Sequence, residues 1–118
     1  MEPHKAIIAF SQSEKIKSGL IWVSQSLELM SGLSAQEKQG AEKIIVSMVN
    51  MVASEIQLAR KVTSDTAWGD VNKSIDQALV MINSKVASES VVHLTQALSL
   101  VTGIAQRSMS FLKEEGLL

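Results

Sequence analysis

Apolar side chains recur every three or four residues along most of the chain, which is the period of an α-helix. No stretch alternates between apolar and polar residues, as a half-buried strand would. The chain therefore predicts an all-α fold. Four helical stripes of apolar or small residues are present: Ala6, Ala9, Ser13, Ile16, Leu20, Val23, Leu27 and Met30; Ala41, Ile45, Met48, Val52, Ile56, Ala59 and Val62; Trp68, Val71, Ile75, Ala78, Leu79, Ile82 and Val86; and Val91, Leu94, Leu98, Val101, Ala105 and Leu112.

Residues typical of helix ends separate the first two stripes. Pro3 can occupy the first turn of a helix, where its missing N–H is not needed. Gly32 follows the first stripe and is expected to end that helix in the left-handed conformation. Ser34 and Glu37 have the spacing of a capping box, in which each side chain pairs with the backbone N–H of the other residue. A second helix should begin there.

The later boundaries are less sharply marked. Ser64, Asp65 and Thr66 are all good N-cap residues, and the sequence does not choose between them. Ser88 is the preferred cap of the fourth helix, which should stop near Gly116. The third helix looks shorter than the others. A loop over Thr63–Asp70 is expected to cover the uneven end that a short helix leaves.

These boundaries predict helices at about 3–31, 34–63, 66–86 and 88–115, within one domain spanning 1–118. Short connections favour antiparallel neighbours, so we expect an up-down-up-down four-helix bundle. A chain of 118 residues is long enough to bury a core without disulfides or a structural metal.

Composition narrows the possible functions. The 11 basic and 12 acidic residues nearly balance and are mixed along the chain, so we expect no nucleic-acid partner. There is no cysteine, which fits a reducing compartment and favours a cytoplasmic location. The N-terminus does not resemble a signal peptide. The uncharged segment 90–106 is too short and too polar to span a bilayer comfortably, so a membrane role is not expected.

The apolar arcs are wider than a bundle core needs. Apolar residues are 46% of the chain and charged residues only 19%, below the usual quarter. Several apolar or small residues point away from the core direction, and contiguous exposed apolar patches usually mark an interface. We therefore expect a homodimer, or a complex with another helical protein. The predicted interface residues are Ile7, Trp22, Leu29, Met51, Leu58, Leu100, Gly103 and Phe111.

Three residues could serve a ligand site. Glu55 lies in the apolar arc of the second helix, where a carboxylate needs a partner or a raised pKa. We favour a structural role, with Glu55 hydrogen-bonded to a Ser, Lys or His of a neighbouring helix. Ser13 is one such neighbour. His93 borders the apolar arc of the fourth helix, and Trp68 could line a small ligand-binding corner. Burial at the end of the bundle is the expected role of Trp68, since a large aromatic buries much area.

No sequence motif supports a metal, a cofactor or a catalytic nucleophile. No Glu-x-x-His pair, phosphate-binding loop or Gly-x-Ser-x-Gly motif is present. We predict a non-catalytic helical protein that acts through protein–protein association, as a dimer, adaptor or chaperone-like protein. The alternative is a bundle that binds a small ligand or cofactor between its helices, with Glu55 and His93 as polar site residues.

Overall fold

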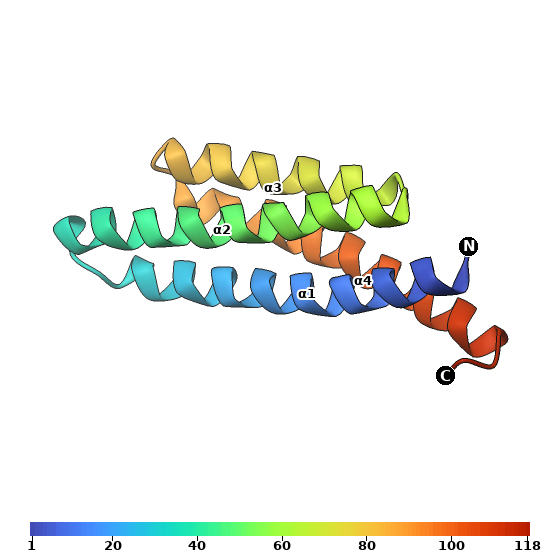
Figure 1. The fold of residues 1–118 in the computed structure, drawn as a ribbon. Helices are drawn as coiled ribbons and strands as arrows, with labels where there is room; N and C mark the ends of the chain where they lie inside the picture. The colour runs from blue at the N-terminus through green and yellow to red at the C-terminus, as the bar shows by residue number, and fades with distance from the viewer.

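The computed structural model describes residues 1–118 and contains four α-helices and one short 3₁₀ helix. Their bounds are α1 Pro3–Ser31, α2 Ala35–Thr63, α3 Ala67–Asn83, η1 Ala87–Glu89 and α4 Ser90–Glu114. The predicted all-α four-helix bundle is confirmed. Successive helices run in opposite directions in an elongated body of 53 × 21 × 19 Å (Figure 1).

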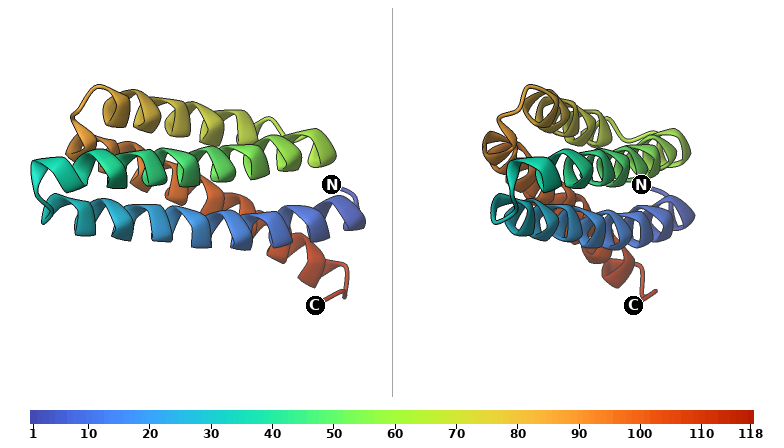
Figure 2. Two further views of the ribbon diagram at one scale, coloured as in Figure 1. Left: turned by 60° about the vertical axis from the view of Figure 1, so that its left-hand side comes forward. Right: turned by 90° about the vertical axis from the view of Figure 1, so that its left-hand side faces the viewer.

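The helices occupy the corners of a square in chain order. Helix α1 packs against α2 and α4, and α3 packs against the same two helices. Helices α2 and α4 are diagonal and do not come close to each other. Helix α4 is also oblique: it lies beside α3 where it begins and passes beneath α1 where it ends (Figures 1 and 2).

The first helix has the predicted bounds, and the second begins one residue later than predicted, with Ser34 as its N-cap. The Ser34 hydroxyl accepts a hydrogen bond from the Glu37 N–H, and the Glu37 carboxylate accepts one from the Ser34 N–H. The capping box is therefore present. Hydrogen bonding of the Glu37 carboxylate to Ser34, first to its backbone N–H and second to its side chain, holds the pKa of Glu37 below its usual range.

The prediction of a left-handed Gly32 was wrong. Its φ is −89°, and its N–H donates to the Leu29 carbonyl in a right-handed turn that continues the helix briefly. The left-handed positions lie elsewhere, at Ser64, Lys85 and Gly116.

The third helix ends three residues earlier than predicted. It stops at Asn83, and Lys85 then takes the left-handed conformation with a φ of 67°. A β-carbon makes this conformation unfavourable, so the sequence does not mark Lys85 as a residue that follows a helix end. The helical stripe through Val86 therefore predicted a longer helix. Ser88 does not cap α4: it lies within η1, and α4 begins at Ser90.

The connection between α2 and α3 is shorter than the predicted loop over Thr63–Asp70. It comprises residues 64–66 only, because Thr63 ends α2 and Ala67 begins α3. The Asp65 carboxylate accepts a 2.9 Å hydrogen bond from the backbone N–H of Ala67, the first residue of α3.

The buried stripe of α1 is the predicted one, residue for residue. The other stripes are partly shifted. In α2, Val49 and Thr63 are buried in place of Met48 and Val62. In α4, Ala97, Ile104 and Ser108 are buried although they lie outside the predicted stripe, whereas Val91 and Leu98 of that stripe are not fully buried. The shift in α4 matters for the surface of the bundle.

Helices α1 and α2 pack closely together at Gly19. A β-carbon on Gly19 would lie 2.8 Å from the Cγ2 of Val52, closer than carbon atoms normally come. Val52 is buried and β-branched, so it cannot easily turn away. Gly40, in contrast, lies on an open surface of α2 with no neighbour within 4 Å of such a β-carbon.

These two glycines give a matched test of the α1–α2 packing. Gly40→Ala should raise the free energy of unfolding by about 1 kcal/mol, because alanine favours a helix interior. Gly19→Ala should lower it, since strain of about 1–3 kcal/mol outweighs that gain. Urea unfolding of both variants measures the difference. An equal stabilisation by both substitutions would contradict the close approach at Gly19.

Candidate functional site

The outer surface of the α1–α2 pair carries five large apolar side chains, which we call the outer face. They are Trp22, Leu29, Ile44, Met51 and Leu58, with exposed fractions of 61%, 75%, 65%, 60% and 50%. Trp22 and Leu29 are seven residues apart, as are Ile44, Met51 and Leu58. This spacing keeps the residues of each helix on one side over two or more turns.

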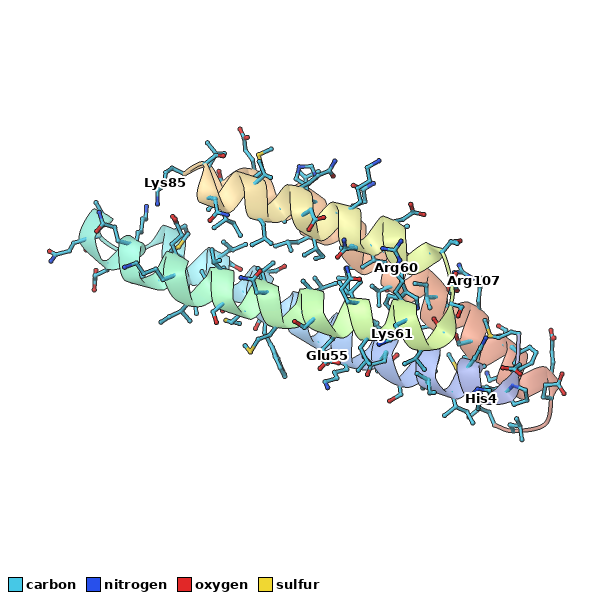
Figure 3. The ribbon with its side chains drawn as sticks, turned by 45° about the horizontal axis from the view of Figure 1, so that its top comes forward. His4, Glu55, Arg60, Lys61, Lys85 and Arg107 are labelled. Carbon is cyan, nitrogen blue, oxygen red and sulfur yellow. The ribbon has the colours of Figure 1, made fainter.

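An ion pair shows that the two rows belong to one surface. Lys15 lies seven residues before Trp22, and Glu55 lies one turn from both Met51 and Leu58. The Lys15 Nζ donates a 2.9 Å hydrogen bond to a Glu55 carboxylate oxygen. The contact joins the two rows across α1 and α2, and Figure 3 shows Glu55 on the side of α2 toward α1.

The eight predicted interface residues do not form a single surface. Trp22, Leu29, Met51 and Leu58 belong to the outer face, to which the structure adds Ile44. Ile7 is exposed but lies in a different row of α1, the one that contains Ile21 fourteen residues later. The remaining three, Leu100, Gly103 and Phe111, are half-buried on α4, which does not reach α2.

Glu55 has the structural role favoured from the sequence. Its partners are Lys15 and Gln12 of the neighbouring helix, and the Gln12 side-chain amide donates a 2.9 Å hydrogen bond to the carboxylate. These bonds, the one from Gln12 first, hold the pKa of Glu55 below its usual range. Ser13 is not a partner, because its hydroxyl donates to the Ala9 carbonyl of its own helix.

The three candidate ligand residues are not brought together. Glu55 lies on α2 and His93 on α4, the diagonal pair of the bundle. The Nδ1 atom of His93 is buried and has no hydrogen-bond partner. Trp68 is completely buried in the core, which agrees with the expected role at the bundle end, and its Nε1 likewise has no partner.

A groove opens at the end of the bundle formed by the α1–α2 connection. At this end α1 and α2 extend beyond the end of α3 (Figure 1). The groove has a volume of about 1020 Å³ and is open on one side. Its walls come from the end of α1, the start of α2, the α3–α4 connection and the start of α4.

Four charged side chains border the groove. The Lys85 Nζ donates a 2.6 Å hydrogen bond to the Glu42 carboxylate, which ties the α3–α4 connection to α2. Figure 3 shows Lys85 at this end of α3, far along the bundle from Glu55. Glu28 and Lys38 also line the groove and form no ion pair.

Sequence reasoning missed the groove because its apolar wall has the period of a core. Val86, Val91 and Leu98 all belong to predicted core stripes, yet all three line the groove. The shift of burial in α4 toward Ile104 exposes Val91 and leaves Leu98 half-buried, and the end of α3 at Asn83 leaves Val86 in the α3–α4 connection. The pattern of a single helix does not reveal how the neighbouring helices lie beside it.

The remaining features do not assign a function. No group of three His, Asp or Glu side chains has the arrangement of a metal site. None of the helices combines the length and hydrophobicity needed to cross a membrane. The chain matches no protein-family model, no curated protein and no solved structure.

The Glu55 bonds predict a specific pH dependence. Because folding lowers the pKa of Glu55, its stabilisation is present above the ordinary glutamate pKa of about 4.3 and is lost as the pH falls through the lower folded value. Glu55→Gln should reduce the free energy of unfolding at about pH 7 by no more than about 1 kcal/mol, because the pair is solvent-screened.

Urea unfolding at about pH 7 and about pH 2.5, on either side of the glutamate range, measures this effect. At the lower pH the difference between Glu55→Gln and the unchanged protein should shrink. Lys15→Met, alone and combined with Glu55→Gln, isolates the Lys15 contribution by a double-mutant cycle. A Glu55→Gln cost that stays constant over this pH range would exclude the carboxylate bonds as its source.

Proposed function

We propose that this protein acts without catalysis, by associating through its outer face with a second copy of the same chain. The exposed apolar row on two adjacent helices is the observation that carries the proposal. Monomeric proteins seldom leave a contiguous surface of this kind in water. The regular spacing of seven residues is the spacing by which helices pack against one another.

The outer face lies within the outer side of the α1–α2 pair, and the whole of that side is large enough for a dimer interface. Helix α1 has 29 residues, so at 1.5 Å per residue it is about 40 Å long. Two adjacent helices are about 20 Å wide, since packed helices lie 8–10 Å apart. The resulting surface of about 800 Å² matches what each partner of a stable complex contributes.

The charges of the outer face favour a copy of itself as the partner. Lys15 and Glu55 are already paired with each other in the same chain. A partner therefore need not supply a compensating charge, and the face presents apolar side chains around one neutral pair. Twofold symmetry then places the same apolar surface on both sides of the interface, the commonest arrangement of homodimers.

The ligand-binding alternative has less support. It needs Glu55 and His93 to act together, but these residues lie on helices that do not meet. The bonds of Glu55 to Gln12 and Lys15 already account for its carboxylate.

Sedimentation equilibrium tests the proposed association. The unchanged protein should sediment at twice the 12.8 kDa mass of the chain. Trp22→Glu and Met51→Glu, on different helices of the outer face, should each weaken the dimer at least about tenfold, because burying an unpaired carboxylate in an apolar interface is costly.

Val80→Glu is the matched control. Val80 is 57% exposed on α3, which carries no residue of the outer face, so this variant should remain dimeric. All three positions are exposed, so circular dichroism should show folded helices throughout. A monomeric unchanged protein, or equal weakening by Val80→Glu, would rule out the outer face as the interface.

A further inference from the structure

The groove at the end of the bundle exposes apolar side chains that nothing in the chain covers. Ile21, Val86 and Val91 remain 43%, 38% and 42% exposed there. Leu27 and Met30 lie beside them and are almost fully buried. Covering apolar surface is favourable by about 25 cal/mol per Å², so these side chains give an apolar occupant a source of affinity.

The charges around the groove cancel. Lys85 is paired with Glu42, and the unpaired Glu28 and Lys38 have opposite signs. An ionic ligand of either sign would therefore find no net opposite charge to compensate for the loss of its own hydration. An uncharged ligand meets no such penalty and leaves the Lys85–Glu42 pair intact.

Hydroxyl groups also line the groove. Ser24, Ser88 and Thr95 face it, and their side chains form none of the hydrogen bonds made by the other serines and threonines. A hydroxyl can both donate and accept, so it can bind a hydroxyl or a carbonyl group of a ligand. The groove thus combines an apolar wall with a few uncharged polar groups.

The dimensions fit a small molecule. The segment of α1 along the groove, Ile21–Ser31, is about 15 Å long at 1.5 Å per residue. The volume of about 1020 Å³ lies at the upper end of the range for ligand pockets, about 300–1,000 Å³.

We propose that the groove binds an uncharged amphiphile, a molecule with an apolar body up to about 15 Å long and one hydroxyl or carbonyl group. The apolar body lies against Ile21, Val86 and Val91, and the polar group hydrogen-bonds to the hydroxyls. This site is separate from the outer face, and it does not depend on association through that face.

Binding can be measured with Nile red, an uncharged dye that becomes fluorescent in apolar surroundings. The dye should bind saturably to the unchanged protein. Decanol, decanoate and decylammonium, which share a chain length, then compete for the site at concentrations below the solubility limit of decanol and the micelle-forming concentrations of the two ions. Decanol should displace the dye at a concentration at least about tenfold lower than either ion, a difference of about 1.4 kcal/mol.

Neighbouring residues provide matched variants. Val91 lines the groove, whereas Val92 does not and is 68% exposed. Val91→Asp should weaken dye binding at least about tenfold, and Val92→Asp should leave it unchanged. Both substitutions fall in the first turn of α4, so their effects on the helix dipole are similar.

A second pair separates the groove from the outer face. Ile21→Asp should weaken dye binding, while Trp22→Asp should not, although it should disrupt the dimer. Equal effects at Val91 and Val92, or preferential displacement by an ion, would overturn the proposal. Absence of saturable dye binding would also overturn the proposed amphiphile site, and a protein segment would then be the better candidate for the groove.

Discussion

The burial of one stripe of α1 against two neighbours is the interaction on which the rest of the structure depends. Helix α1 packs against α2 on one side and α4 on the other, and its eight buried residues face the space between them. Close contact at Gly19 holds α2 alongside α1, so their outer sides form one continuous surface. The groove lies at one end of the same helix, between the last residues of α1, the start of α2 and the start of α4. Helix α1 therefore contributes residues to both the outer face and the groove.

The sequence predicted the fold well where a single helix determines its own structure. The stripe of α1 and the capping box at Ser34 need only local spacing and local hydrogen bonds, and both are confirmed. The errors arise where a turn or a neighbouring helix decides. Lys85 adopts a conformation that few lysines take, so the end of α3 was misplaced. In α4, the crossing angle turns Ile104 inward and Val91 outward, and one-dimensional periodicity does not contain that angle.

The candidate sites show the same division. Exposure of Trp22 and Leu29 followed from their position opposite the α1 stripe, which a helical projection gives directly. The link between the α1 and α2 rows required the contact from Lys15 to Glu55 across two helices. The groove needed still more, because Val86, Val91 and Leu98 of its apolar wall follow the predicted core stripes. Low charge and abundant apolar residues thus leave two exposed apolar surfaces, the outer face and the groove.

Quenching of tryptophan fluorescence by acrylamide tests most directly whether the outer face is covered. The chain has two tryptophans: Trp68 is fully buried, whereas Trp22 is 61% exposed in the single chain and should dominate quenching by the solute. If a second copy covers the outer face, quenching should decrease as protein concentration rises, toward the value of a Trp22→Phe variant that retains only Trp68. Strong quenching that stays the same at every protein concentration would contradict a covered outer face.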